Sequence, residues 1–212
     1  KTSQTVHEEL QLNDGDKLVL VTPGGGQDGY NLINTYLQGQ EFLKNHQNHI
    51  KSLIFCGPEM PKKHKQELYK AAAKYPQIQI REFSNDLMSY LSAADAVVSM
   101  GGYNTVCEII SAAKPAVIVP RIQPSQEQLI RSQRMQDLGL LNSIHPENLT
   151  PQALIAQLFQ VLKNPSYPKN IDLEGLPRIA RHIRNLLANK ITETQRKFFY
   201  PKANQSQKFL VS

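Results

Sequence analysis

The sequence predicts an α/β protein with a doubly wound, Rossmann-like parallel sheet of about six strands and helices on both faces. Short apolar runs recur six times after residue 16, and segments whose apolar residues have helical spacing separate them. Such alternation favours a parallel sheet, because each helix carries the chain back across one face of the sheet. Ligands bind outside the carboxyl ends of such strands, so the loops after the strands are the candidate sites.

The composition is that of an ordinary globular protein. The 212 residues are 40% hydrophobic and 20% charged, with a mean hydropathy of -0.42, which suffices for one well-filled core or two small ones. No apolar run approaches a membrane-spanning length and no leader-like segment stands at the start, so we expect neither a spanning helix nor a signal peptide. Cys56 and Cys107 lie inside apolar stretches, which predicts core thiols and a cytoplasmic location, with peripheral attachment to a membrane left open.

The predicted strands are short, partly β-branched and bounded by Gly, Pro or Asn, as buried parallel strands are. They are residues 17–21, 52–56, 78–83, 95–100, 115–120 and 140–145. The helices are expected at residues 30–45, 62–74, 86–94, 102–113, 126–138 and 151–164. Ser84 is the candidate N-cap of the third helix, with Asp86 in its first turn.

Three segments of different character divide the chain. Residues 1–16 are polar and aperiodic, and we expect a linker or a trimmed inter-domain segment. Residues 17–164 hold all the predicted strands and are expected to form the ligand-binding domain. Residues 165–212 are expected to form a connector rich in Pro and Asn, a basic amphipathic helix at 178–190 and a polar tail.

The net charge of +6 is unevenly distributed. Residues 1–150 hold 14 of the 24 Lys and Arg residues and 15 of the 18 Asp and Glu residues, so the basic excess lies in the last 62 residues. A nucleic-acid-binding protein usually carries its basic residues on the folded domain, so no nucleic-acid partner is predicted. The basic helix suits a membrane surface, a neighbouring domain, or packing on the sheet.

A glycine-rich loop follows the first predicted strand. Gly24, Gly26 and Gly29 satisfy G-x-G-x-x-G, and Gly25 and Gly26 would let a backbone or a ligand approach closely. A dinucleotide site also needs an acidic residue at the end of the second strand, where the sequence has Cys56-Gly57 instead. A different ligand, a close contact between domains and a structural turn therefore remain as explanations.

A second glycine-containing loop, residues 100–105, follows the fourth predicted strand and opens a helix. Gly101 and Gly102 allow a tight turn, and the N–H groups near Asn104 and Thr105 would point at an anion such as a diphosphate. Glu108 lies one turn further on, where a carboxylate could accept both hydroxyls of a ribose. Turn glycines and a helix-capping glutamate would explain the same residues equally well.

A third polar element follows the fifth predicted strand. Glu127 and Gln128 begin a helix that also carries Arg131, and their side chains suit sugar hydroxyls. Taken alone, such a pair is typical of a solvent-exposed helix start.

The order and spacing of these pieces resemble a known family. The run G-x-N-T-x-x-E from Gly102 to Glu108, followed by Pro120 and the Glu127-Gln128 pair, is similar to the donor-binding C-terminal half of a GT-B glycosyltransferase. It is most similar to the C-terminal domain of the MurG-like glycosyltransferase family 28. The resemblance spans roughly residues 17–159 and implies a nucleotide-sugar-binding domain.

The resemblance also implies a role for each matching residue. The amides of residues 101–105 would hold the donor diphosphate, Glu108 the ribose, and the backbone at Phe83 the base. The loop at Gly25 and Gly26 would face the cleft between domains. Glu127, Gln128 and Arg131 would read the transferred sugar. This chain departs from the family at two positions. Plant UDP-glycosyltransferases, which it resembles more distantly, have His where this chain has Met100, and MurG has Asn where this chain has Arg131.

Other chemistry is not indicated. Asp14-Gly15-Asp16 spells the D-x-D metal motif but precedes the first strand, so we expect a turn there, and the six His residues lack metal-ligand spacing. We therefore expect no metal and no bound cofactor.

No residue within 17–160 suits the general base that would deprotonate an acceptor, so no catalytic residue is assigned. The expected function is the binding of a UDP-sugar or similar donor in transfer of a hexose or N-acetylhexosamine to an acceptor hydroxyl. The acceptor site would lie on an N-terminal domain or a partner subunit, without which this chain would be inactive. The alternatives are a nucleotide-sugar epimerase-like enzyme and a non-catalytic nucleotide-binding subunit.

Overall fold

The structure is a computed structural model that describes residues 1–44, 49–163, 171 and 173–187. The chain divides into two compact units, residues 1–169 and residues 170–212, which we describe separately.

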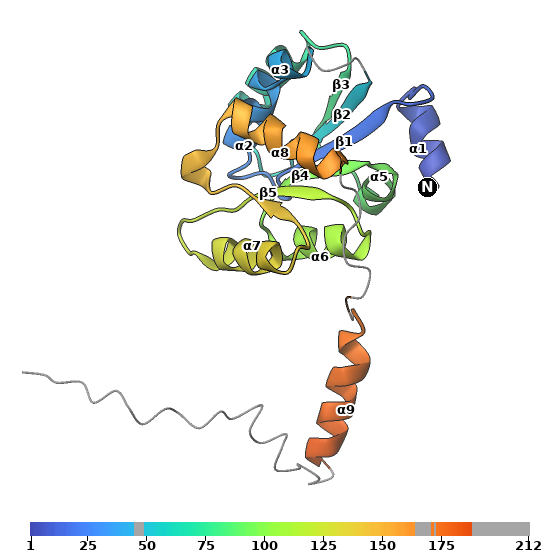
Figure 1. Cartoon of the computed structure of the whole chain (residues 1–212), viewed down its shortest axis with the longest axis vertical. Coiled ribbons are helices and arrows are strands. Elements are labelled where there is room, and N and C mark those ends of the chain that lie inside the picture. The colour runs from blue at the N-terminus through green and yellow to red at the C-terminus, as the bar shows by residue number, and fades with distance from the viewer. Residues whose placement is uncertain (45–48, 164–170, 172, 188–212) are drawn as a thin grey trace, which may run out of the picture. The chain divides into compact units, whose positions relative to one another are not determined.

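The first unit is built on a six-stranded, fully parallel sheet (Figure 1), which confirms the predicted fold class. The strand order is β3-β2-β1-β4-β5-β6, so the winding direction reverses between β1 and β4. The strands are β1 (Lys17–Thr22), β2 (Ile50–Phe55), β3 (Ile78–Arg81), β4 (Ala96–Met100), β5 (Ala116–Val119) and β6 (Asn142–Ser143).

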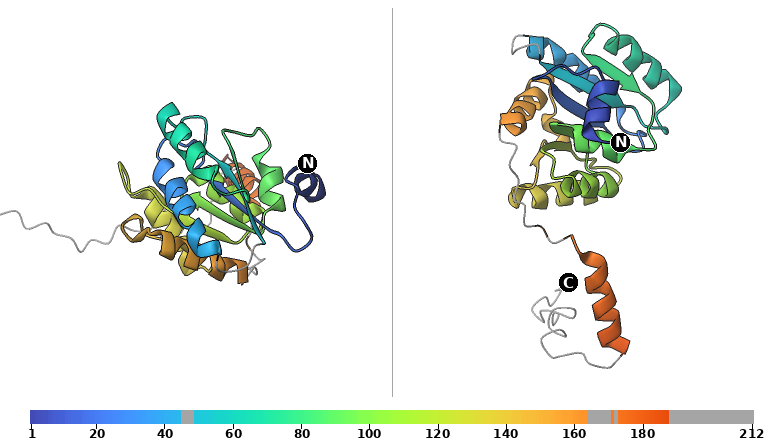
Figure 2. Two further views of the ribbon diagram at one scale, coloured as in Figure 1. Left: turned by 90° about the horizontal axis from the view of Figure 1, so that it is seen from above. Right: turned by 90° about the vertical axis from the view of Figure 1, so that its right-hand side faces the viewer.

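Helices cover both faces of the sheet (Figures 1 and 2). On one face pack α2, α3, α4 and α8, and on the other pack α1, α5 and α6, with α7 beside β6. Their bounds are α1 (Ser3–Glu9), α2 (Tyr30–Gln38), α3 (Gln40–Lys44), α4 (Lys62–Ala72), α5 (Leu87–Ala93), α6 (Tyr103–Ser111), α7 (Glu127–Asp137) and α8 (Pro151–Lys163). A 3-10 turn spans Pro146–Asn148.

Strand β1 is buried on both faces, as a central parallel strand must be. Val19 and Val21 point to the α2 side, whereas Leu18 and Leu20 point to the α5 side. The apolar run predicted there follows from this double burial.

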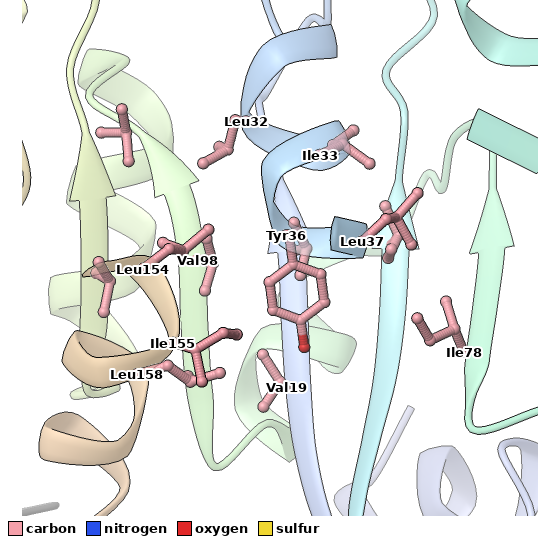
Figure 3. Close-up of a cluster of buried hydrophobic side chains, with 14 of the residues drawn as sticks. Val19, Leu32, Ile33, Tyr36, Leu37, Ile78, Val98, Leu154, Ile155 and Leu158 are labelled. Atoms are coloured by element: carbon pink, nitrogen blue, oxygen red, sulfur yellow. The ribbon is translucent and has the colours of Figure 1, made fainter. Parts of the chain in front are cut away.

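Tyr36 of α2 lies at the centre of the core on the α2 side (Figure 3). Its hydroxyl shares a buried 2.7 Å hydrogen bond with the hydroxyl of Ser52 in β2, which satisfies both polar groups. Burial raises the pKa of Tyr36 to about 12, so the phenol is neutral at physiological pH. The surrounding apolar side chains drawn in the figure include Val19, Leu32, Ile33, Leu37, Ile78, Val98, Leu154, Ile155 and Leu158.

The N-terminal segment differs from the expectation for residues 1–16. Instead of an aperiodic stretch, it forms helix α1, which packs on α5. The side chain of Val6 is fully buried and Leu10 nearly so, and both join the core on the α5 side. Thr2 caps the helix by accepting a hydrogen bond from the Thr5 N–H at 3.2 Å. Val6 is the one apolar residue within the span of α1, which is too few to give a helical period.

Three smaller expectations were also wrong. The helix predicted for residues 30–45 is two helices that meet at Gly39, where a Cβ would lie 2.7 Å from Cγ1 of Ile155. Helix α5 has Asp86, not Ser84, at its N-cap; the Ser84 hydroxyl accepts the Asp86 N–H one step earlier. The strand predicted at residues 140–145 forms only the two-residue edge strand β6.

The structure describes residues 171 and 173–187 of the second unit, and these include helix α9 (Gly175–Leu187). The expected helix at residues 178–190 thus starts three residues earlier, and residues 188–190 lie outside the described part. Its apolar side chains are exposed, namely Leu176, Ile179, Ile183, Leu186 and Leu187. Within the described residues, no helix has the length and apolarity needed to cross a membrane.

Candidate functional site

The loops after β1 and β4 come together where the strand order reverses. These strands are hydrogen-bonded neighbours, with Thr22 of β1 in register with Ser99 of β4. The chain leaves both strands on the same side, and the Ser99 hydroxyl donates a 2.6 Å hydrogen bond to the Thr22 carbonyl oxygen. This is the place where open α/β sheets bind ligands.

The β1–α2 loop owes its glycines to contact with the β2–α4 loop. Gly26 has a φ of +97°, and a Cβ there would lie 2.3 Å from the Cys56 carbonyl oxygen. Gly57 has a φ of +88°, and a Cβ there would lie 2.4 Å from the Gly25 carbonyl oxygen. The Glu59 N–H donates a 2.9 Å hydrogen bond to the same Gly25 oxygen. Close packing of two backbones therefore explains this loop without a dinucleotide.

The β4–α6 loop has the opposite character at Gly102. This residue is the N-cap of α6 with an ordinary φ of -60°, and it supplies no side-chain cap for the first N–H groups of the helix. A Cβ at Gly102 would meet no atom within 4 Å. By contrast, a Cβ at Gly101 would lie 3.0 Å from Oγ of Ser132 in α7. An uncapped helix start thus opens onto free space, which is the geometry of an anion site.

Two cavities meet at this helix start. The first has a volume of about 350 Å³ and contains Phe83 and Glu108 in its lining. The second has a volume of about 270 Å³ and contains Gly102 and Gln128. Both are also lined by Gly24, Gly25, Asn104 and Thr105, so they share a wall formed by the two loops.

Most of the residues singled out from the sequence converge on these cavities. Phe83 is 57% exposed at the rim of the first cavity, and Glu108 is half-buried beside it. Gly26 joins the lining of the second cavity. Glu127 and Arg131 line neither cavity.

Arg131 is directed behind the β4–α6 loop. Its Nη1 donates a 2.8 Å hydrogen bond to the Gly101 carbonyl oxygen, and its guanidinium is paired with the Glu127 carboxylate. The guanidinium carbon also lies 5.2 Å from the centre of the Tyr103 ring. Arg131 and Glu127 therefore support the loop from outside the cavities.

Sequence reasoning missed the charged residues of the second cavity, which are Asp28, Glu59 and Arg121. Arg121 follows Pro120 at the carboxyl end of β5, and Nη1 pairs with Asp28 Oδ2 at 2.8 Å. The Arg121 N–H donates a 3.0 Å hydrogen bond to Oε1 of Gln128. The position of Arg121 directly after a predicted strand was the available signal.

Other chemical groups near the loops have structural partners. Lys65 Nζ lies 2.5 Å from Oε1 of Glu82 and 3.2 Å from the Pro58 carbonyl oxygen. Burial raises the pKa of the Cys56 thiol to about 11, so this thiol stays protonated at neutral pH and is a poor nucleophile.

Asp14–Asp16 form a turn in which Gly15 has a φ of +89°. The described residues contain no cluster of three or more His, Cys, Asp and Glu able to hold a metal ion.

Residues 18–183 match the model of the glycosyltransferase family 28 C-terminal domain. The chain belongs to this family. The match confirms the resemblance inferred from the run between Gly102 and Glu108. The family 28 domain therefore accounts for the sheet, for the two loops at the site, and for the chain as far as α9.

Individual relatives agree with this assignment. The UDP-N-acetylglucosamine--N-acetylmuramyl-(pentapeptide) pyrophosphoryl-undecaprenol N-acetylglucosamine transferase of Histophilus somni (strain 129Pt) is 27% identical over 164 residues, which are 76% of this chain and 42% of that protein. The crystal structure of MurG from Acinetobacter baumannii has a TM-score of 0.57 at 25% identity, covering 78% of this chain and 45% of that one. The solution structure of ALG13 shares the fold, with a TM-score of 0.52 at 16% identity over 77% of this chain and 94% of that one. This chain thus spans less than half the length of the first two relatives.

Proposed function

We propose that this family 28 domain binds the nucleotide-sugar donor, a UDP-sugar, of a glycosyltransferase that transfers a hexose or N-acetylhexosamine to an acceptor hydroxyl. The observation that carries the proposal is the uncapped start of α6, which opens onto free space at Gly102 between two cavities. The name of the Histophilus relative, a transferase that uses UDP-N-acetylglucosamine, supports a uridine nucleotide.

The two cavities would hold different parts of the donor. The first cavity receives the nucleoside, with the backbone at Phe83 against the base and the Glu108 carboxylate accepting the ribose hydroxyls. The shared wall at Asn104 and Thr105 lies at the helix start, where the diphosphate binds. The second cavity receives the sugar. There Oε1 of Gln128 accepts a hydrogen bond from the backbone N–H of Arg121. The amide NH₂ of Gln128 is therefore the group that can donate to a sugar hydroxyl.

The chemistry follows from where charge develops during transfer. Breaking the bond between the sugar and the diphosphate leaves negative charge on the phosphate oxygens, next to fixed N–H groups and the positive end of the α6 dipole. Those groups stabilise the leaving diphosphate without a metal ion. Deprotonation of the acceptor hydroxyl needs a general base, which we assign to the domain or subunit that binds the acceptor.

The acceptor side is proposed to lie on an N-terminal domain or a separate partner subunit. Both longer relatives extend over more than twice the length that this chain matches. A transferase closes the donor and the acceptor between two surfaces, so this chain alone would bind the donor with little or no transfer.

Helix α9 is proposed to make a peripheral contact with a membrane at its cytoplasmic face. Its exposed apolar side chains and its arginines, including Arg181 and Arg184, are the two elements of an interfacial helix. Co-sedimentation of the full chain with phosphatidylglycerol vesicles, and not with phosphatidylcholine vesicles, is the expected result. Sedimentation with neither would instead favour docking of α9 on the acceptor domain.

Calorimetric titration with UDP-, GDP- and dTDP-sugars tests the donor proposal. We expect binding of a UDP-sugar, weakened about tenfold or more by Glu108→Ala, because the ribose loses its acceptor. Glu147→Ala removes an exposed carboxylate outside both cavities and is the matched control. Failure of every donor to bind, or equal binding by the Glu108 variant, would contradict the proposal. Epimerisation of UDP-N-acetylglucosamine without an acceptor would also contradict it.

A further inference from the structure

The second cavity has too little positive charge in its lining for the negatively charged ligand proposed above. Its charged lining residues are two carboxylates, Asp28 and Glu59, and one cation, Arg121. Each phosphoryl group of a nucleotide sugar adds about one further negative charge. The α6 helix start contributes only about half a positive charge. A diphosphate bound at the wall of this cavity, where α6 begins, therefore needs a cation that can turn toward it.

Arg121 is the cation in a position to do so. Among the described residues that line the second cavity, Arg121 is the one Lys, Arg or His. Arg131 of α7, which contacts the β4–α6 loop, is committed to the Gly101 carbonyl oxygen and to Glu127. The backbone of Arg121 is held by Gln128, so its side chain starts from a fixed point beside the proposed sugar position.

The present arrangement of the guanidinium is incomplete. Nη1 donates a 2.8 Å hydrogen bond to Asp28 Oδ2, while Nε is buried without a hydrogen-bond partner among the described residues. A buried donor without an acceptor costs free energy. A rotation that presents Nε and an Nη together to a phosphate would satisfy both donors, because the guanidinium fork matches two phosphate oxygens.

We propose that Arg121 binds the donor diphosphate and that Asp28 holds the guanidinium beside the cavity while the cavity is empty. This inference rests on the proposed function and names the charge partner at the same site. Asp28 lies in the β1–α2 loop and Arg121 after β5, so the ion pair connects the two sides of the second cavity. Donor binding exchanges the Asp28 carboxylate for phosphate oxygens on the same guanidinium.

Titration of the full chain with UDP and UMP tests the assignment. Arg121→Gln should weaken UDP binding about tenfold or more and UMP binding by less, since the second phosphate is the group that reaches Arg121. Arg121→Lys should recover only part of the loss, because an ammonium keeps the charge without the fork. Arg134→Gln makes the same change of net charge on an exposed site of α7 and should leave both affinities unchanged.

A double-mutant cycle tests the role of Asp28. Asp28→Asn should strengthen UDP binding, because Arg121 no longer has to leave an ion pair. In the Arg121→Gln background the same change should have a much smaller effect. Equal gains in both backgrounds would overturn the exchange between Asp28 and phosphate.

The outcomes separate this inference from the donor proposal. If wild type binds UDP and Arg121→Gln binds it equally well, with an unchanged melting temperature, Arg121 is not the diphosphate partner and the donor site stands. If wild type binds none of UDP, dTDP and GDP, the donor proposal and this inference both fall.

Discussion

Nη1 of Arg131 donates a 2.8 Å hydrogen bond to the carbonyl oxygen of Gly101, across the space between α7 and the β4–α6 loop. A Cβ at Gly101 would also lie 3.1 Å from Cβ of Gln128, so α7 presses directly on this turn. Arg131 thus supports the loop that opens α6. The orientation of the proposed diphosphate amides depends on a residue outside the cavities.

Arg131→Ala should therefore reduce both stability and donor binding. The Gly101 oxygen loses a charge-assisted hydrogen bond and the Tyr103 ring loses the guanidinium beside it. We expect the free energy of unfolding to fall by about 1–2 kcal/mol in urea titrations. Arg134→Ala, on the same helix but exposed, should change it by less than about 0.5 kcal/mol. Equal stability of the two variants would show that Arg131 does not support the loop.

Two glycine substitutions should separate folding from binding. Gly26→Ala places a Cβ against the Cys56 carbonyl oxygen at a positive φ, so we expect a loss of about 3 kcal/mol of stability. Gly102→Ala meets no protein atom and should leave the melting temperature nearly unchanged, yet its methyl group occupies the space proposed for the diphosphate. Its UDP affinity should fall about tenfold or more. Wild-type affinity in the Gly102 variant would contradict the placement of the diphosphate.

Helix α1 should contribute to the stability of the first unit. Val6 is fully buried against the core on the α5 side, so Val6→Ala removes two methyl groups and leaves a cavity. We expect the free energy of unfolding to fall by about 2 kcal/mol in urea. Gln4→Ala changes an exposed residue of the same helix and is the control. A Val6 variant as stable as wild type would mean that α1 is not docked in solution.

The anchoring of α1 should depend on pH through Glu9. Hydrogen bonds from Lys1 and then Arg81 lower the pKa of Glu9 to about 2, against burial, which acts in the opposite direction. Because the pKa is lower in the folded chain than in the unfolded chain, the stabilisation is present above about pH 4.5 and disappears as the pH falls toward 2.

Glu9→Gln tests this linkage. The variant should be less stable than wild type by about 1–2 kcal/mol at pH 7, and the difference should shrink toward pH 2. Glu8→Gln makes the same substitution at a neighbouring exposed position of α1 and is the control. A stability difference that persists unchanged at pH 2 would contradict the assignment to the Glu9 carboxylate. Chemical denaturation at a series of pH values measures it.

The sequence predicted the strands and the β4–α6 loop because their signals are local. A run such as residues 96–100 is apolar throughout because both faces of its strand are covered, and Gly101-Gly102 before Asn104 and Thr105 indicates a turn that opens a helix. The weaker elements were missed for the same reason. Helix α1 buries only Val6 within its span, so its polar sequence carries no periodic signal.

The sequence by itself determined the α/β class, the alternation of strands and helices after residue 16, and the run from Gly102 to Glu108 that resembles the family. Only the tertiary structure decided that Arg121 and Asp28, 93 residues apart, form an ion pair in one cavity. It also decided that Arg131 supports a turn. The physical reason is that local propensity and burial act between near neighbours in the chain. The distance between two loops depends on strand order, which places β4 between β1 and β5 and brings their carboxyl ends to one edge.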